Sequence, residues 1–395
     1  METPISKKLA VGILFGGKSA EHEVSLQSAK NVYDAIDRSK FEPVLIGIDK
    51  SGRWLLNGES RFLLNADDPR RISLNPEGKP VVLIPESAGI LTGLESSKSG
   101  GSAETLGVRR GQPPAAAEKT ASRDAGPGRL DVVFPILHGP FGEDGTVQGL
   151  LKLANIPFVG PGVLGSAAGM DKDVMKRLLK DAGIPVGKFL VLPAHKPVPA
   201  FAEISGVLGR SFFIKPANMG SSVGISKVHE EGEYSVAVKT AFQYDTKIVA
   251  EEFIPGRELE CAVLGNEYPS ASVPGEVISS HEFYSYDAKY LDEKGARLEI
   301  PAKVPEETGK RVQELAIKTF QALCCEGLSR VDFFLKESGE VIVNEINTMP
   351  GFTRISMYPK LWEASGIGYT ELISRLIGLA IERFEKERAL KTTMM

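Results

Sequence analysis

The chain contains 395 residues, which at roughly 150 residues per domain predicts two or three domains. Hydrophobic residues make up 42% and charged residues 25%, values that exclude wholesale disorder and leave enough apolar side chain for more than one core. Lys and Arg total 47 against 51 Asp and Glu, so the net charge of -4 gives no global electrostatic reason to expect nucleic acid or an anionic membrane as a partner.

The cysteines and the N-terminal residues indicate the cellular compartment in which the protein works. Three cysteines without CxxC spacing indicate neither a disulfide framework nor a zinc site, and they favour a reducing compartment, here the cytoplasm. The first apolar run is followed by charged residues where a signal peptide needs small ones, so we interpret it as a buried strand. No stretch approaches about 18 consecutive apolar residues, and we therefore expect no transmembrane helix.

Short apolar runs alternate with amphipathic stretches in the first part of the chain. The predicted strands lie at residues 9–15, 43–49 and 131–137, and the predicted helices at residues 25–37 and 147–154. This order predicts an α/β domain with a mainly parallel sheet over residues 1–160. Residues 95–128 are dominated by Gly, Ser, Ala and Pro and contain no aromatic residue, which predicts a flexible surface insertion.

Two further units are predicted, a central one over residues 161–254 and a C-terminal one over residues 255–395. A helical stretch that ends before Gly183 and Pro185 opens the central unit, and a predicted β-hairpin lies in the C-terminal unit. The predicted elements are helices at residues 164–182 and 306–323, strands at residues 211–216 and 247–254, and a hairpin at residues 331–347.

Two glycine patterns resemble nucleotide-binding loops. GILFGGKS, residues 12–19, matches the P-loop pattern, which would place Lys18 at the phosphates. However, the apolar residues 13–15 extend the predicted strand, whereas in a P-loop these positions form the turn that follows the strand. A P-loop nucleotide hydrolase using Lys18 therefore stays as the alternative hypothesis. GPGVLG, residues 160–165, matches a dinucleotide fingerprint, but Pro161 fixes the loop backbone and no second mononucleotide-binding half follows, which favours a plain turn between domains.

The segment PANMGSSVG, residues 216–224, follows a predicted strand that ends in Lys215. Exposed backbone N–H groups, hydroxyls and an ammonium group suit a nucleotide polyphosphate. The same loop standing alone could be an ordinary polar hairpin loop.

The predicted hairpin brings a set of polar side chains to one face. If residues 338–339 form a two-residue turn, Asp332 pairs with Glu345 and Arg330 pairs with Asn347. Two carboxylates directly opposite each other repel unless a cation lies between them. An all-oxygen ligand set favours Mg²⁺, and the neighbouring guanidinium can hold a phosphoryl group. A solvated edge hairpin is the other interpretation.

Eight ordered motifs resemble a known family. MDK, IKPANMGSSVG, EEFIPGRE, SRVDFF and NEINTMPGF occur in the order of the ATP-grasp ligases, and GGKSAEHEVS, LHGPFGEDG and FYSYDAKY are similar to D-alanine-D-alanine ligases in particular. The resemblance covers nearly the whole chain except residues 95–128. It implies an α/β ATP-grasp ligase fold with three α/β domains, a Rossmann-like N-terminal domain followed by two ATP-grasp domains, and ATP held between the second and third sheets.

The resemblance also implies ligands for ATP and metal. It implies two Mg²⁺ ions, with Mn²⁺ as a possible substitute. The residues implied at the ATP phosphates are Lys172, Lys215 and Lys289, the one at the adenine amino group is Glu251, and the one at the ribose is Glu258. Glu252 and Ile254 are also implied as ATP-binding residues, and the implied metal ligands are Asp332, Glu345 and Asn347.

For the amino acids, the resemblance implies ligation of two D-alanine molecules through a D-alanyl phosphate. Glu23 would orient the first D-alanine and form a hydrogen-bonded set with Ser221 and Tyr290, the latter accompanying D-alanine rather than D-lactate as second substrate. The other implied residues are His138 and Ser356 near the substrates, and Arg330 and the N–H of Gly351 at the oxyanion. Residues 283–301 would close over the intermediate.

The resemblance further implies a cytoplasmic homodimer in peptidoglycan precursor synthesis, with neither nucleic acid nor membrane as a partner. Besides the P-loop hydrolase, a nucleotide-binding regulatory module without turnover is a third class. The intact set of Arg330, Asp332, Glu345 and Asn347 argues against that module, because it has no evident need for metal ligands together with an oxyanion donor.

Overall fold

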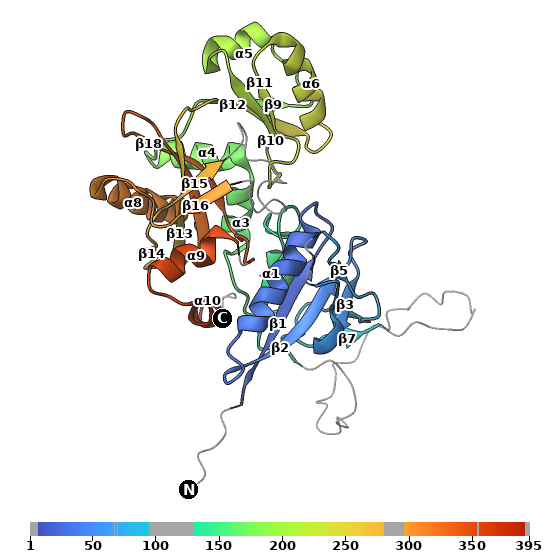
Figure 1. Cartoon of the computed structure of the whole chain (residues 1–395). Helices are drawn as coiled ribbons and strands as arrows, with labels where there is room; N and C mark the ends of the chain where they lie inside the picture. The colour runs from blue at the N-terminus through green and yellow to red at the C-terminus, as the bar shows by residue number, and fades with distance from the viewer. Residues whose placement is uncertain are drawn as a thin grey trace, which may run out of the picture.

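The structure is a computed structural model and describes residues 7–66, 68, 70–94, 129–279, 296–353 and 355–391. Within these ranges the strands form three large sheets and one small two-stranded pair. Figure 1 shows the three sheets in three separate bodies, coloured blue, yellow-green and orange to red along the chain. The predicted α/β class is confirmed, whereas residues 95–128, Lys289 and Tyr290 lie outside the described residues.

The first sheet has the strand order β7-β6-β3-β2-β1-β8. Its central strands β2, β1 and β8 are parallel, as expected for a Rossmann-like unit, but β3, β6 and β7 join antiparallel. The prediction of a mainly parallel sheet is therefore wrong for these outer strands. The β2–β3 and β6–β7 connections are too short for a crossover helix, and the longer β3–β6 connection forms β4, β5 and a short 3-10 helix instead of one. The strands are β1 (Leu9–Gly16), β2 (Phe41–Ile48), β3 (Trp54–Asn57), β6 (Lys79–Leu83), β7 (Leu91–Gly93) and β8 (Val132–Ile136).

Two helices of this unit agree with their predictions to within a few residues. Helix α1 (His22–Ala35) begins three residues before the predicted start at residue 25, and α2 (Thr146–Leu153) begins and ends one residue early. The small pair β4 (Leu63–Leu64) and β5 (Ser73–Leu74) and the short 3-10 helix η1 (Glu59–Arg61) complete the unit.

The second sheet is antiparallel, in the order β11-β10-β12-β9. Alternate residues of β10, such as Phe212 and Ile214, enter a core shared with helices α5 and α6. Its elements are β9 (Phe189–Pro193), α5 (Phe201–Leu208), β10 (Phe212–Pro216), β11 (Ser226–Val228), α6 (Glu231–Ala241) and β12 (Lys247–Glu252).

The third sheet is also antiparallel, in the order β16-β15-β13-β17-β18 with β14 beside β13. One face packs on α8 around Val312, Phe320 and Phe333. Its elements are β13 (Arg257–Gly265), β14 (Ser270–Ala271), β15 (Gly275–Ser279), β16 (Ala296–Glu299), α8 (Glu306–Ala322), β17 (Gly327–Leu335) and β18 (Val341–Asn347).

The single helix predicted over residues 164–182 is two helices, α3 (Val163–Met170) and α4 (Lys172–Asp181). Asp171 separates them because it adopts extended backbone and its side chain accepts from the N–H groups of Asp173 and Val174, which is N-cap chemistry. Ala168 and Met175 on these helices belong to the core of the third sheet. The predicted limits of the three domains remain predictions.

The C-terminal helices α9 (Met357–Ala364) and α10 (Tyr369–Arg388) join the first and third units. Phe352, just before α9, meets Phe134 of β8 edge to face with ring centroids 5.7 Å apart. Arg383 of α10 donates to the carbonyl of Phe158 at 2.8 Å and to that of Gly160. Residues 160–162 of the GPGVLG segment are thus a turn held by α10, and residues 163–165 are the first residues of α3.

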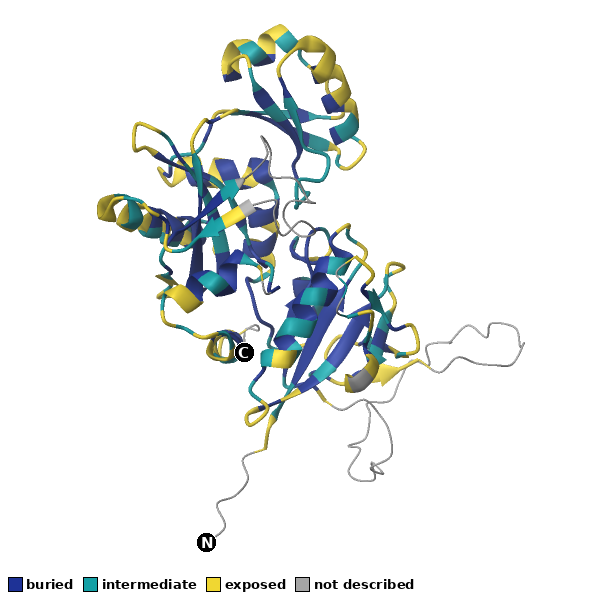
Figure 2. Cartoon of the chain, in the orientation of Figure 1, coloured by how far each residue is buried: buried dark blue, intermediate teal, exposed yellow. Residues whose placement is uncertain are grey.

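Figure 2 shows buried residues concentrated along the strands, with exposed residues on the outer faces of the helices. None of the helices in the described ranges is long and apolar enough to cross a membrane.

Candidate active site

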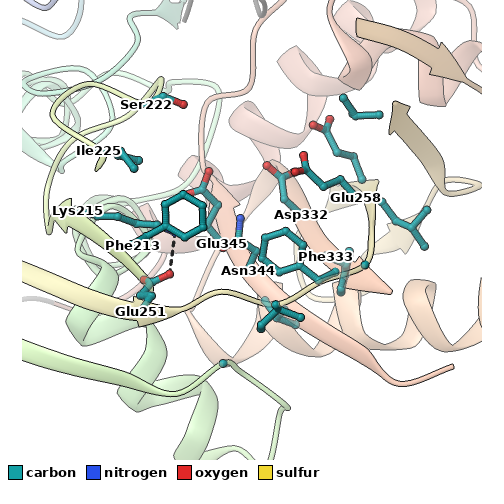
Figure 3. Close-up of a pocket in the computed structure, with 18 of the residues that line it drawn as sticks. Phe213, Lys215, Ser222, Ile225, Glu251, Glu258, Asp332, Phe333, Asn344 and Glu345 are labelled. Atoms are coloured by element: carbon teal, nitrogen blue, oxygen red, sulfur yellow. Dashed lines mark hydrogen bonds and ion pairs between the residues drawn. The ribbon is translucent and has the colours of Figure 1, made fainter. Parts of the chain in front are cut away.

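A cavity of about 430 Å³ lies between the second and third sheets. Figure 3 shows Lys215 and Glu251 on one side of it and Glu258 and Asp332 on the other. The predicted site residues that line it are Lys172, Lys215, Ser221, Glu251, Glu252, Ile254, Glu258, Asp332 and Glu345. Residues far apart in the sequence therefore meet where the resemblance implied a nucleotide.

Two predicted lysines enter this cavity from different elements. Lys172 is the first residue of α4, and its Nζ donates to the carbonyl of Met219 at 2.6 Å. Lys215 lies on β10, where the alternation that buries Ile214 in the core turns residue 215 toward the cavity. Both ammonium groups are thereby held beside the loop that follows β10.

The electrostatics at Lys215 are set by Glu251, whose Oε2 is 2.7 Å from the lysine Nζ. Burial alone would lower the pKa of Lys215, but the carboxylates of Glu251 and Glu345 more than offset this and leave its pKa raised. Burial would raise the pKa of Glu251, but Lys176 and Lys215 overcome it and hold that pKa at about 2. This part of the cavity therefore carries the charged carboxylate of Glu251 and the charged ammonium of Lys215 at neutral pH.

Glu251 also lines the cavity. Its Oε1 is buried and accepts no hydrogen bond among the described residues. The neighbouring Glu252 uses one carboxylate oxygen differently, because its Oε1 accepts the backbone N–H of Lys188 at 2.7 Å. Of these two adjacent acids, Glu251 is thus the one that has a carboxylate oxygen without a hydrogen bond in the described structure.

The loop after β10 is held at its base. Asp245 accepts from the backbone N–H and the side-chain amide of Asn218 at 2.8 and 2.9 Å. Ser221 and Ser222 have φ values of 49° and 62°, a region that residues other than glycine rarely adopt. This backbone brings the loop residues 219–222 to the cavity wall, as the sequence predicted.

The hairpin of β17 and β18 pairs Asp332 with Glu345 and Arg330 with Asn347, which confirms the predicted register at the site. The route to this register differs from the prediction. Near the turn Leu335 pairs with Val341, because the turn has three residues rather than two. A bulge at Asn344 then shifts the register by one residue and restores the predicted pairs.

The face that carries the predicted metal ligands is held by cationic and amide groups. Arg330 donates from Nε and Nη2 to the two oxygens of Asp332, both at 2.7 Å, and lies 2.8 Å from Glu260. Asn347 donates its amide to Asp332 at 3.0 Å. Within the described part of the chain, no three His, Cys, Asp or Glu side chains gather closely enough to hold an ion by themselves.

A second, smaller cavity of about 70 Å³ adjoins the first. The two share wall residues Gly220, Ser221, Glu260, Val277 and Glu345. The small cavity also contains predicted residues from the first and third units. These are His138, Arg330, Asn347, Gly351 and Ser356.

The structure corrects one predicted residue of this small cavity. Ser221 donates to Glu21, which is 6% exposed and immediately precedes α1. Glu23, the residue predicted for this contact, pairs instead with Lys50 at 2.6 Å and has a side chain that is 33% exposed. Two residues on a helix differ by about 200° in direction, so one of the two acids faces the cavity and the other faces outward.

The loop after β8 carries two buried groups that hold the backbone of Met349. His138 Nδ1 lies 3.0 Å from the Met349 carbonyl, and Glu143 accepts the Met349 N–H at 3.0 Å and the Gly139 N–H at 2.7 Å. Burial and the nearby Glu21 raise the pKa of Glu143 to about 8. Glu143 was not among the residues predicted from the sequence, even though it belongs to the LHGPFGEDG motif.

His138 should make stability depend on pH. Burial lowers the pKa of His138 to about 4 from an ordinary value of 6.5, so the folded protein keeps it neutral while the unfolded chain protonates it. Its contribution is complete above pH 6.5 and is lost as pH falls toward 4, by up to about 3 kcal/mol. In urea denaturation at pH 6.5 and pH 4, His138→Gln should lose less unfolding free energy than the wild type; equal losses would contradict this.

Gly351 and Ser356 lie side by side before α9. A Cβ at residue 351 would come within 2.8 Å of Ser356 Oγ, so glycine is needed for this close approach. Ser356 Oγ accepts the Thr353 N–H at 3.0 Å. The hydroxyl and the glycine backbone both reach the small cavity, as predicted for residues near a substrate.

The P-loop alternative receives no support from the geometry. Gly17 donates its N–H to the carbonyl of Ile48 at 2.8 Å, and β1 extends to Gly16. Ser19 donates to the carbonyl of His138 at 2.7 Å, and the Lys18 ammonium lies over the ring of Phe141. These groups form contacts within the first unit instead of a phosphate cradle.

A nucleotide-sized cavity between two antiparallel sheets, lined by Lys172 and Lys215 and by the paired carboxylates of Asp332 and Glu345, defines an ATP-grasp enzyme. Comparisons with known proteins agree with this class. Models of the D-ala D-ala ligase N-terminus and C-terminus match residues 10–161 and 178–378. This chain belongs to the D-alanine-D-alanine ligase family, which implies ATP and a divalent metal ion.

Curated relatives and solved structures match almost the whole chain. The D-alanine-D-alanine ligase of Shouchella clausii is 53% identical over 98% of both chains, and ligase A of Escherichia coli K12 is 51% identical over 98% of this chain and 100% of its own length. The D-alanine-D-alanine ligase structure from Coxiella burnetii has a TM-score of 0.78 at 36% identity, covering 97% of each chain. The D-Ala:D-Ser ligase VanG of Enterococcus faecalis has a TM-score of 0.75 at 36% identity, covering 95% and 100%.

Proposed function

We propose that this chain uses ATP to join two D-alanine molecules into D-alanyl-D-alanine, releasing ADP and phosphate, for peptidoglycan precursor synthesis. The observation that carries the proposal is the contact between the two cavities at Gly220, Ser221 and Glu345. The phosphate end of a nucleotide in the larger cavity would lie beside a small amino acid in the smaller one. Phosphoryl transfer between them then requires no movement of either substrate between sites.

The roles proposed for the ATP-binding residues follow from their charge and position. Lys172 and Lys215 would hold the phosphates, with Lys289 added from the part of the chain that is not described. Glu251 would accept from the adenine amino group through Oε1, which has no hydrogen bond in the described structure, and Glu258 would hold the ribose hydroxyls. Ile254 is 8% exposed and would pack against the base, and Glu252 would act through the backbone it holds.

We propose that Asp332, Glu345 and Asn347 hold two Mg²⁺ ions, with Mn²⁺ as a substitute. The donor set fits, since two opposed carboxylates and an amide supply only oxygen ligands, and phosphate oxygens and water would complete the coordination. When bound, divalent cations neutralise negative charge on the phosphates. The Lys172 ammonium lies 3.9 Å from Glu345, on the same side of the cavity.

The proposed reaction has two steps. A carboxylate oxygen of the first D-alanine attacks the γ-phosphorus and the bond to the bridging oxygen breaks, which yields D-alanyl phosphate and ADP. The amine of the second D-alanine then attacks the acyl carbon, loses a proton and expels phosphate. The first step needs positioning and positive charge, from Lys172 and Lys215, and the second needs donors for a tetrahedral oxyanion, from Arg330 and the N–H of Gly351.

Glu21 takes the role first assigned to Glu23. Its carboxylate borders the small cavity and would bind the ammonium group of the first D-alanine, while Ser221 orients it. His138 and Ser356 would border the same substrates, and Tyr290 would complete the set. We further propose that the chain works as a homodimer in the cytoplasm, as the family resemblance implies.

ADP release and product mass, followed together, test the proposed function. With Mg²⁺ and ATP, D-alanine should give ADP and D-alanyl-D-alanine in equal amounts, and L-alanine should give neither. Because VanG is described as a D-Ala:D-Ser ligase, D-serine and D-lactate should each be tested as the second substrate. ADP release that is indifferent to D-alanine would reject the proposal.

Lys18→Ala separates the ligase from the P-loop alternative. The side chain lies over Phe141 and outside both cavities, so the variant should keep D-alanine-dependent ADP release within about two-fold of wild type. A P-loop enzyme would lose its turnover with this lysine. Steady-state ADP release at saturating ATP decides between the two.

A further inference from the structure

Lys176 is a buried cation that the sequence motifs did not single out. It lies on α4 four residues after Lys172, so the two lysines occupy the same face of the helix and both line the large cavity. Lys176 is 2% exposed, which is unusual for a lysine outside an ion pair. The groups that contact its ammonium therefore indicate the role of the buried charge.

The Lys176 ammonium contacts groups from two different sheets. Its Nζ lies 3.5 Å from Glu251 Oε1 on β12, and it donates to the carbonyl of Asn344 on β18 at 3.2 Å. Asn344 is the bulge residue that has no cross-strand Cα partner, and it immediately precedes Glu345. Lys176 thus connects the proposed adenine acceptor to the strand that carries a proposed metal ligand.

Glu251 lies between two ammonium groups. Lys215 approaches Oε2 at 2.7 Å, whereas Lys176 approaches Oε1 at the longer distance and leaves it without a hydrogen bond in the described structure. Burial lowers the pKa of Lys176 and the charge of Glu251 opposes that shift. The arrangement balances the carboxylate charge while Oε1 of this cavity-lining residue accepts no hydrogen bond within the described part of the chain.

We propose that Lys176 is a positioning residue that fixes Glu251 so that its Oε1 selects a 6-amino purine nucleotide over a 6-oxo one. An exocyclic amino group donates to the carboxylate, whereas a 6-oxo group brings a second acceptor against it. A site built around such a donor rejects analogues that lack it by large factors. This inference rests on the proposed function, because it assigns the base to the Glu251 end of the cavity.

The test compares ATP with inosine triphosphate in D-alanine-dependent ADP or IDP release at saturating Mg²⁺ and D-alanine. Wild type should prefer ATP in kcat/KM by at least about 100-fold. Lys176→Met, which keeps the length of the side chain and removes its charge, should lower kcat/KM for ATP while leaving that for inosine triphosphate nearly unchanged, so that the preference falls below about 10-fold. Lys180→Met, at an exposed position of the same helix, is the matched control and should keep the wild-type preference.

Lys176→Gln is a second variant in case Lys176→Met fails to fold, because the glutamine amide can still donate to the Asn344 carbonyl. This variant should show the same loss of base preference. A folded Lys176 variant that loses activity equally with both nucleotides would overturn the inference and assign the lysine a purely structural role. Absence of D-alanine-dependent turnover in wild type would instead reject the proposed function, so the two failures are distinguishable.

Discussion

Glu21→Gln should lower kcat/KM for D-alanine by about 10- to 100-fold, because the variant loses a charge-assisted hydrogen bond worth about 1.5–3 kcal/mol to the substrate ammonium. Ser221 keeps a polar partner in this variant, so the fold should persist. Initial rates over a range of D-alanine concentrations at saturating ATP measure the effect.

Glu23→Gln is the matched control for this prediction. The Glu23 side chain pairs with Lys50 at the surface, where ion pairs contribute little, so rates and stability should stay within about two-fold and 0.5 kcal/mol of wild type. A larger loss in Glu23→Gln than in Glu21→Gln would contradict the assignment of Glu21 and restore the residue expected from the sequence.

Arg330→Lys should reduce kcat by about 100- to 1000-fold, because the side chain loses the forked geometry proposed to stabilise the oxyanion. Lysine keeps one positive charge beside Asp332 and Glu260, so the two partly buried carboxylates retain a cation. Arg330→Met should also be destabilised, by roughly 3–5 kcal/mol, since it leaves both acids without that partner.

The order of steps gives a second measurement for Arg330. If the guanidinium acts mainly on the tetrahedral intermediate, Arg330→Lys should lose dipeptide formation more than D-alanyl phosphate formation, which trapping with hydroxylamine measures. Equal loss of both steps would assign the residue to phosphoryl transfer instead.

The hairpin shows what pattern arguments can and cannot predict. Alternation along two strands was enough to place Asp332 opposite Glu345, because one face of the sheet had to be apolar. The predicted turn was one residue shorter than the observed turn, and the extra residue at the Asn344 bulge restored the predicted pairing beyond it. A bulge depends on contacts beyond the two strands, here with Lys176, and no periodic pattern in the hairpin contains that information.

Positions on helices were harder to assign. Glu21 and Glu23 flank the start of α1, and only the direction of the helix decides which acid meets Ser221. Lys176 follows Lys172 by one helical turn, a spacing visible in the sequence, but it is also the spacing of an ordinary solvated helix face. Its burial against the third sheet follows from tertiary packing.

The first sheet illustrates a limit of element order. The alternation of strands and helices correctly indicated the parallel centre of β2, β1 and β8. It did not indicate the antiparallel outer strands, because their segments are short and their connections carry little apolar signal. The direction of these strands became evident only from their pairing with neighbouring strands in the structure.

In the proposed mechanism, a D-alanine carboxylate in the small cavity accepts the phosphoryl group of ATP bound in the large one. D-Alanine labelled with ¹⁸O in its carboxylate tests this directly, with the label followed by mass into phosphate and dipeptide. One labelled oxygen should enter the phosphate for each D-alanyl-D-alanine formed. Phosphate without the label would mean that water or another group attacks ATP, and it would contradict the account.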